Sequence, residues 1–264
     1  MLRNASEING YAIAASDGRL GTVSDFLFDD ASWMVRWLVV DTGDWLSGRK
    51  VLLPPLVLGH PDPKEEQFPV RLTKQQVKDS PEIETEWPVS RQMEANVYDY
   101  YGWAPYWGAS LYMGGYGFMP GYGSMDRAGT PSASVETRQR EQQIADERRE
   151  KDDPHLRSIK TVTGYHIHAS DGEIGHVEDF LMDDTDWSIH YFIVDTKNWW
   201  PGKKVLISPR LVREIDWKDK QVHLHVDRQK VKASPEYDAS TTVDRTYEKH
   251  FHGYYDEIEP NDRR

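Results

Sequence analysis

The chain has 264 residues and a formal net charge of −12, and 29% of its residues are charged. Nucleic-acid affinity rests largely on clustered Lys and Arg that neutralise phosphates, so this acidity disfavours RNA or DNA as a partner. The absence of cysteine excludes disulfides, thiol nucleophiles and thiolate-bound metals. No stretch approaches the roughly 20 apolar residues of a membrane-spanning helix, and no signal peptide is recognisable. We therefore expect a soluble, cytoplasmic protein.

The sequence contains a direct repeat at an offset of 154 residues. Between residues 10 and 55, 24 of 46 positions are identical to the positions 154 residues later, without a gap. The register still holds where Ser80-Pro81-Glu82 recurs as Ser234-Pro235-Glu236. Agreement over this length indicates a duplicated domain.

Each copy has the pattern of short β-strands. Asp17-Gly18 in the first copy separates two strand-like runs, and this dipeptide favours a hairpin turn. The run from Val35 to Val40 alternates β-branched and aromatic residues, as a central strand does. Thr73, and Asp227 in the second copy, suit the N-cap of a short helical turn that follows the last strand. About six short strands in each copy predict a small closed barrel, because closure removes exposed strand edges.

The segment Asp17–Asp25, followed by a strand that ends at Val39-Val40-Asp41, resembles the PRC-barrel family. This resemblance covers residues 5–83 and 159–237 and implies an all-β chain with two small barrels. The family is named after the cytoplasmic part of the photosynthetic reaction-centre H subunit, and a related barrel ends a ribosome maturation factor. It implies docking and assembly rather than chemistry. The chain lacks the membrane helix of the first relative and the RNA-processing domain of the second.

Eight residues at equivalent positions are expected to shape the two barrels. A buried acid within a strand can anchor a neighbouring loop by accepting backbone hydrogen bonds, and we favour this role over catalysis for the strand aspartates. The eight residues are Asp17, Gly18, Gly21 and Asp25 in the first copy, and Asp171, Gly172, Gly175 and Asp179 in the second.

Residues 84–158 form a linker between the copies, and residues 238–264 are expected to form a polar tail. The stretch Tyr98–Met125 is too rich in Gly and Pro to predict a regular helix, and the charged stretch Val135–Asp153 predicts a solvated helix or spacer. The aromatic stretch either packs over the barrels, binds a partner or another copy, or is disordered.

Aromatic residues in this stretch and in the loop after the central strand are the candidate partner contacts, because such side chains anchor protein interfaces. They are Trp45, Trp199, Trp200, Tyr100, Tyr101, Trp103, Tyr106 and Trp107. Because Trp45 and Trp199 occur in both copies, a role in capping the barrel mouth is the first interpretation for them, and Trp200, which Leu46 replaces in the first copy, is the better interface candidate.

The sequence contains no nucleophile elbow and no phosphate-binding loop. The second copy carries histidines in alternating positions, at His166 and His168 and at His223 and His225, which leaves metal binding or pH sensing as an alternative. The first copy has no histidine at these positions, so surface histidines are the favoured interpretation. We expect no enzyme and no cofactor.

The leading hypothesis is a non-enzymatic scaffold whose partner is a protein, either another copy of the chain or a different subunit. One alternative is an accessory subunit of a membrane or photosynthetic electron-transport complex, bound peripherally. A ribosome-assembly role is disfavoured by the charge.

Overall fold

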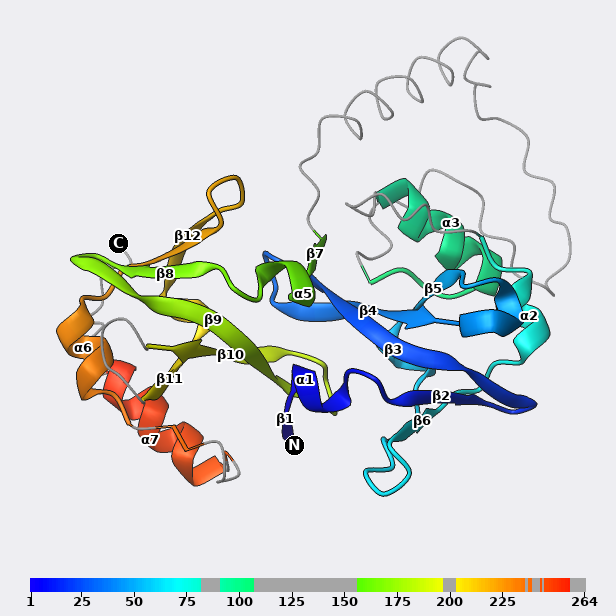
Figure 1. Cartoon of the computed structure of the whole chain (residues 1–264), viewed down its shortest axis with the longest axis horizontal. Helices are drawn as coiled ribbons and strands as arrows, with labels where there is room; N and C mark the ends of the chain where they lie inside the picture. The colour runs from blue at the N-terminus through cyan, green and yellow to red at the C-terminus, as the bar shows by residue number, and fades with distance from the viewer. Residues whose placement is uncertain are drawn as a thin grey trace, which may run out of the picture. The chain divides into compact units, whose positions relative to one another are not determined.

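The computed structural model describes residues 1–81, 91–106, 156–196, 203–235, 237–238, 243 and 245–256. The chain divides into two compact units, which are residues 1–82 together with 156–264, and residues 83–155. Both repeats belong to the first unit (Figure 1). Each repeat is built on one β-sheet, which confirms the predicted all-β fold with two barrel-like domains.

The sheet of the first repeat has the order β5-β4-β3-β2-β6. Only the β2–β6 pair is parallel; the other pairs along this order are antiparallel. Short helical turns η1, η2 and α2 connect or follow these strands. The elements are β2 (Ala12–Ala15), β3 (Gly18–Asp29), β4 (Met34–Asp41), η1 (Gly43–Leu46), β5 (Lys50–Leu53), η2 (Pro55–Val57), β6 (Gln67–Pro69) and α2 (Lys74–Lys78).

The second repeat has the order β11-β10-β9-β8-β13-β12, again with one parallel pair, β8 with β13. Strand β12 is the addition relative to the first sheet. The elements are β8 (His166–Ala169), β9 (Gly172–Asp183), β10 (Ile189–Asp195), β11 (Lys204–Ile207), η4 (Pro209–Leu211), β12 (Val212–Asp216), β13 (Gln221–Leu224), α6 (Arg228–Ala233) and α7 (Arg245–Asp256).

Local signals of the sequence place the ends of the short helices. Thr73 caps α2 in a capping box with Gln76, in which each side chain bonds the other residue's backbone N–H. In the second repeat, Asp227 caps α6 and accepts a hydrogen bond from the backbone N–H of Lys230 at 2.8 Å. The predicted N-caps are therefore confirmed in both copies.

The first segment of each repeat docks on the other repeat. Strand β1 (Leu2–Asn4) pairs with β9 of the second repeat, and β7 (Leu156–Ser158) pairs with β3 of the first. The one-turn helices that follow, α1 (Ala5–Ile8) and α5 (Ile159–Val162), contact the same strands (Figure 1). Each repeat therefore supplies a strand to the sheet of the other. The expected domain bounds at residues 5 and 159 leave these strands out.

The length of β3 and β9 explains this exchange. Strand β9 pairs with β8 along its first half only, up to His176, and β1 takes up the same edge at residues 181–183. In the first repeat, β2 and β7 divide the edge of β3 in the same way. Because an unpaired strand edge leaves backbone N–H and C=O groups unsatisfied, the exchanged strands complete both edges.

Two tryptophans, each with a left-handed backbone conformation, pack their side chains against the opposite repeat. Trp33, at φ 57°, packs its ring edge-on against Phe192 of the second repeat at 5.2 Å, and Trp187, at φ 64°, packs against Phe68 of the first at 5.8 Å. Backbone hydrogen bonds also join the two repeats here. The N–H of Val35 donates to the C=O of Trp187, and the N–H of Ile189 donates to the C=O of Trp33, each at 2.8 Å. The two cores therefore meet at a shared aromatic junction.

The C-terminal segment, expected to be a polar tail, contains helix α7. Phe251 of α7 is fully buried and packs edge-on against Tyr191 of β10 at 4.9 Å, and the Tyr254 hydroxyl donates to the C=O of Lys230 at 2.8 Å. The helix packs on the second repeat because burial of these aromatic side chains against a hydrophobic surface is favourable.

Helix α3 (Arg91–Tyr101) corrects the expectation that the aromatic stretch starts without regular helix, since its last four residues belong to that stretch. Gly102, at φ 67°, ends the helix, because glycine adopts this conformation without steric cost. At the offset of 154 residues, α3 corresponds to α7, and Arg91, Glu94, Tyr100 and Tyr101 recur as Arg245, Glu248, Tyr254 and Tyr255. The duplication therefore extends about 20 residues beyond the predicted end of each barrel.

Candidate functional site

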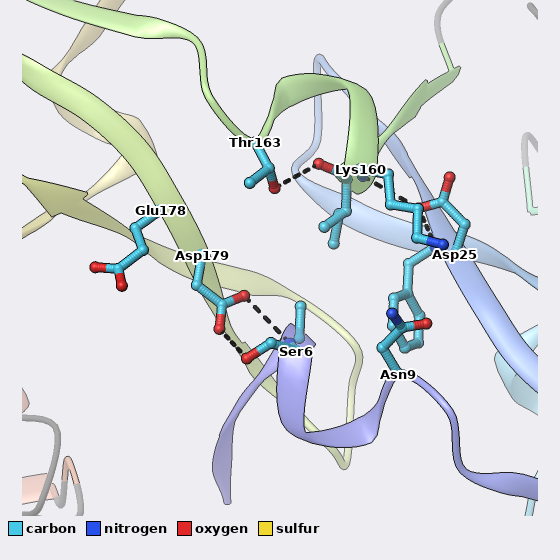
Figure 2. A pocket seen from close by; sticks show the side chains of 10 residues that line it. Ser6, Asn9, Asp25, Lys160, Thr163, Glu178 and Asp179 are labelled. Atoms are coloured by element: carbon cyan, nitrogen blue, oxygen red, sulfur yellow. Dashed lines mark hydrogen bonds between the residues drawn. The ribbon is translucent and has the colours of Figure 1, made fainter.

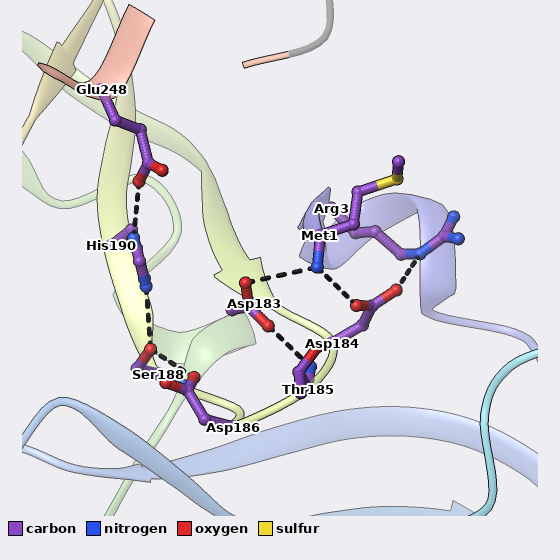
Figure 3. Close-up of polar contacts among 9 residues, drawn as sticks. All are labelled: Met1, Arg3, Asp183, Asp184, Thr185, Asp186, Ser188, His190 and Glu248. Atoms are coloured by element: carbon purple, nitrogen blue, oxygen red, sulfur yellow. Dashed lines mark hydrogen bonds and ion pairs between the residues drawn. The ribbon is translucent and has the colours of Figure 1, made fainter. Parts of the chain in front are cut away.

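The junction of the two repeats carries a reciprocal pair of ion pairs. Arg3 of β1 binds Asp184 of the second repeat at 2.7 Å (Figure 3), and Arg157 of β7 binds Asp30 of the first at 2.8 Å. These residues are partly buried, with side chains 14–20% exposed. Arg157 also stacks its guanidinium over the ring of Trp217 at 3.9 Å. The two ion pairs therefore help to hold each exchanged segment on the opposite repeat.

Asp25 and Asp179 hold the start of the opposite repeat. Asp25 accepts hydrogen bonds from the Ser158 hydroxyl at 2.5 Å and from the Lys160 N–H at 3.2 Å. Asp179 accepts from the hydroxyl and the N–H of Ser6, at 2.5 and 3.2 Å (Figure 2). Desolvation by burial raises the pKa of both carboxyl groups, although these hydrogen bonds oppose the rise.

A β-bulge explains why these two acids point across the junction. The register between β3 and β4 shifts between Val23 and Asp25, and the register between β9 and β10 shifts at Asp179. A bulge adds one residue to a strand and re-aims the side chains that follow it. After the bulge, residues 25–29 are buried on both faces, because the other repeat covers the outer face.

A cavity of about 210 Å³ lies between the two exchanged helices (Figure 2). Both repeats contribute to its wall, with the carboxylates of Asp25, Asp179 and Glu178 and the side chain of Lys160 among its polar groups. A second cavity of about 310 Å³ shares Glu178 and Asp179 with the first. Sequence reasoning missed both cavities because they form only when the segments are exchanged.

The predicted turn residues have defined contacts. Asp17 accepts a hydrogen bond from the N–H of Lys74 at 2.9 Å, and Asp171 accepts from the N–H of Arg228 at 2.8 Å, so each turn holds the start of the following helix. Gly18 and Gly172 have φ of 130° and 145°.

Two further glycines permit a close approach between strands. A Cβ built on Gly21 would lie 2.1 Å from the C=O oxygen of Asp41, and one on Gly175 would lie 2.0 Å from that of Asp195. No side chain fits at either position.

The aromatic candidates fall into three groups. The Trp45 indole N–H donates to the C=O of Leu20 at 2.5 Å, and the Lys74 ammonium lies over its ring, so this half-buried side chain packs on its own barrel. Tyr101 and Trp103 stack at 4.1 Å with Tyr100 edge-on at 4.7 Å, and the Tyr106 hydroxyl donates to Glu94 at 3.0 Å. Trp107, Trp199 and Trp200 lie outside the described residues.

The candidate histidines lie on neighbouring strands of the second sheet. His168 and His223 are register partners with ring centroids 5.5 Å apart, and His166 binds Glu173 at 2.9 Å. His225 follows β13. Within the described part of the chain, no three His, Asp or Glu side chains are grouped so as to hold a metal ion. Metal binding stays an untested alternative.

A polar network that sequence reasoning missed joins β10 to α7 (Figure 3). The Ser188 oxygen lies 2.5 Å from Asp186 and 2.9 Å from His190 Nε2, and His190 Nδ1 lies 2.9 Å from Glu248. A carboxylate only accepts hydrogen bonds, so the single Ser188 proton is held by Asp186 and not by the imidazole. The arrangement therefore differs from a catalytic triad, in which the imidazole takes the serine proton. It fastens α7 to the sheet.

Both repeats match the model of one known protein family. The model of the PRC-barrel domain matches residues 2–72 and 158–231, which is more than half of the chain. The chain therefore belongs to the PRC-barrel family and contains two copies of the domain. Unlike the expected bounds, both matched ranges take in residues of the exchanged strands.

One curated relative is an uncharacterized protein of Deinococcus radiodurans. It is 33% identical to this chain over 86 residues, which are 33% of this chain and 31% of the relative. The chain thus spans about a third of the relative's length.

No helix within the described residues is both long and apolar enough to cross a bilayer.

Proposed function

We propose that this chain is a non-enzymatic, protein-binding scaffold whose two PRC-barrel domains form one platform. The reciprocal exchange supports the platform, because neither sheet is complete without a strand from the other repeat. A platform held in this way keeps a constant spacing between surfaces on the two barrels, which suits assembly. The family resemblance supports assembly as well.

The observation that carries the binding role is the aromatic cluster of Tyr98, Tyr100, Tyr101, Trp103 and Tyr106. Its rings pack on one another, and Tyr100 is 41% exposed at its edge. An exposed tyrosine on a rigid aromatic base loses little conformational entropy on binding, and such residues dominate protein interfaces. We propose that the partner is a protein, either another subunit or a second copy of this chain.

The test is affinity capture from lysate of the native organism with three immobilised baits: the wild-type chain, Tyr100→Ser and Leu56→Ser. Leu56 is 60% exposed on η2 and is the matched control for loss of an exposed apolar side chain. We expect a stoichiometric partner that wild type and Leu56→Ser retain and Tyr100→Ser loses. Equal capture by all three baits, or capture of nothing, would contradict the proposed surface.

A further inference from the structure

Helix α7 is joined to the second sheet by a histidine whose two ring nitrogens both have polar partners. His190 of β10 reaches Glu248 of α7 through Nδ1 and the hydroxyl oxygen of Ser188 through Nε2, each at 2.9 Å (Figure 3). The pair is partly buried, with 30% of the His190 side chain and 22% of the Glu248 side chain exposed. The hydrogen-bonding capacity of these partners therefore decides how many protons the ring carries.

Both partners of the ring accept hydrogen bonds in this arrangement. The Glu248 carboxylate has no proton to give, so Nδ1 donates to it. The Ser188 hydroxyl is committed to Asp186, because the two oxygens are 2.5 Å apart and the carboxylate supplies no proton between them. Asp186 is held in place by the backbone N–H of Ser188, which donates to it at 2.9 Å. Nε2 therefore donates as well, and the ring that fits this geometry is the doubly protonated imidazolium.

The first repeat has a permanent cation at the same position of the sequence. Arg36 stands 154 residues before His190, and Glu94 stands 154 residues before Glu248, so each copy carries a basic residue in the strand and an acid in the helix. Arginine is always charged, whereas imidazole exchanges its proton between about pH 5 and pH 8. The second repeat thus has the same sign of charge in a form that titrates.

The other titratable groups around this ring keep one charge state over that range. Burial raises the pKa of Tyr247 in α7 to about 12 and also raises the pKa of Tyr191, so both hydroxyls stay neutral. Carboxylates and guanidinium groups stay ionised from about pH 5 to pH 8, and the pKa of the Met1 ammonium is raised above its ordinary value of 8.0. The charged groups nearby are the Met1 ammonium, Arg210 of η4, Glu248 of α7, and Asp183, Asp184 and Asp186 in the turn before β10.

We propose that His190 is a pH switch for the docking of α7, which holds the helix on β10 while the ring is an imidazolium and weakens this contact when the ring loses a proton. The neutral ring keeps one N–H for Glu248, and the single Ser188 proton then has to serve both Asp186 and Nε2. The attraction between the imidazolium and the Glu248 carboxylate is lost as well. Docking therefore weakens as the pH rises and the ring is deprotonated. This switch is independent of the aromatic cluster in the proposed function.

The first measurement follows the ring and the helix in the same full-length sample. Nitrogen-15 NMR of the histidine rings reports whether each ring nitrogen of His190 is protonated, and the signal is assigned by its absence from His190→Arg. Hydrogen exchange at the backbone amides of Phe251 and Tyr255 reports docking, as protection factors that correct for the pH dependence of intrinsic exchange. We expect a doubly protonated ring wherever α7 is fully protected, and one shared midpoint for deprotonation and loss of protection.

The decisive variant is His190→Arg, which places the residue of the first repeat in the second. Over about pH 5 to pH 8, we expect protection of α7 to fall roughly five- to tenfold in wild type, the size of one partly exposed charge-assisted hydrogen bond, and to stay constant in His190→Arg. His166→Arg is the matched control. His166 also pairs with a glutamate at 2.9 Å, Glu173, but on strands β8 and β9 of the same sheet. This variant should keep the pH dependence of wild type.

A second variant, Glu248→Gln, tests the helix side of the contact without changing the ring. Its amide oxygen can accept from Nδ1 but carries no charge, so we expect weaker protection of α7 at low pH and a much smaller change with pH. Two results would overturn the proposal. One is a His190 ring with an unprotonated nitrogen while α7 is still fully protected, and the other is an equal fall of protection in wild type and His190→Arg.

Discussion

Asp25 and Asp179 are the residues on which the junction most depends. Each is more than nine-tenths buried and accepts hydrogen bonds from a segment that begins the opposite repeat. Burial raises the pKa of both carboxyl groups above the ordinary value of 3.8. The folded protein therefore binds these two protons more tightly than the unfolded chain, and the contribution of these two groups to the free energy of unfolding falls as the pH rises from 3.8 through their folded pKa values.

The raised pKa values of these two carboxyl groups predict how the stability of the double variant Asp25→Asn, Asp179→Asn depends on pH. Asparagine does not titrate, so the variant lacks the loss of stability that ionisation of the buried acids causes. We expect its melting temperature relative to wild type to rise as the pH increases above 3.8, and to level off once both buried carboxyl groups are ionised. Thermal melts followed by circular dichroism at closely spaced pH values measure this difference, in which all other acids cancel. A difference that stays constant with pH would contradict the assignment.

Gly21 and Gly175 give a second prediction at this scale. Because a Cβ at either position would meet a backbone oxygen at about 2 Å, Gly21→Ala or Gly175→Ala should lower the free energy of unfolding by about 3 kcal/mol or more. Gly43 is the control: unlike Gly21 and Gly175 it has a positive φ, of 60°, but a Cβ there meets nothing within 4 Å. Gly43→Ala should cost only about 1 kcal/mol of backbone strain. Urea denaturation measures all three, and equal losses would contradict the close-approach argument.

At the scale of elements, the exchange of β1 and β7 defines the fold. Each exchanged strand is only three residues long, yet each brings an ion pair and a hydrogen-bonded helical turn to the other repeat. Trp33 and Trp187 follow the long strands and place their rings in the opposite core. The two sheets therefore share one hydrophobic core.

A shared core predicts cooperative unfolding. Trp187 is 6% exposed and contacts both Phe26 and Phe68 of the first repeat, so Trp187→Ala should cost about 3–5 kcal/mol. Both repeats should lose stability together, as one lower transition in scanning calorimetry with equal calorimetric and van't Hoff enthalpies. Two resolved transitions, one of them at the wild-type temperature, would show that the repeats fold separately.

The sequence predicts the local elements but not their exchange. Asp17-Gly18, Thr73 and Asp227 act within a few residues of their own position, so their turns and caps follow from the local pattern. The pairing of Leu2–Asn4 does not, because β3 and β9 are near copies and offer the strand the same partners. The bulges that turn Asp25 and Asp179 toward the opposite repeat are likewise set by pairing. The junction cavity depends on that choice and could not be predicted.

The helices α3 and α7 show a different limit. Their correspondence rests on only four identical residues, which lie beyond the last clearly repeated segment, Ser80-Pro81-Glu82 and Ser234-Pro235-Glu236. The aromatic residues of α7 form no clear apolar stripe in the sequence. Their burial becomes evident only from their packing against β10. Tertiary contacts, rather than local propensity, account for this helix.

Considered as a whole, the molecule consists of two PRC-barrel domains that complete each other within one chain. The direct alternative is that each repeat pairs its first strand with its own long strand. The register separates the two arrangements, because Leu2 lies opposite Asp183 in the exchanged form. In the unexchanged form, Leu2 would lie opposite Asp29, which is the residue 154 positions earlier. The chain has no cysteine, so a single introduced pair can be read without background.

The most direct test is oxidative cross-linking of two double variants, Leu2→Cys with Asp183→Cys and Leu2→Cys with Asp29→Cys. Residues directly opposite in an antiparallel pair have Cβ atoms about 5 Å apart, close enough for a disulfide after small adjustments. We expect a rapid intrachain disulfide in the Asp183 variant and none in the Asp29 variant, as measured by non-reducing electrophoresis and peptide mass spectrometry. A disulfide in the Asp29 variant alone, or only disulfide-linked dimers, would contradict reciprocal exchange within the chain.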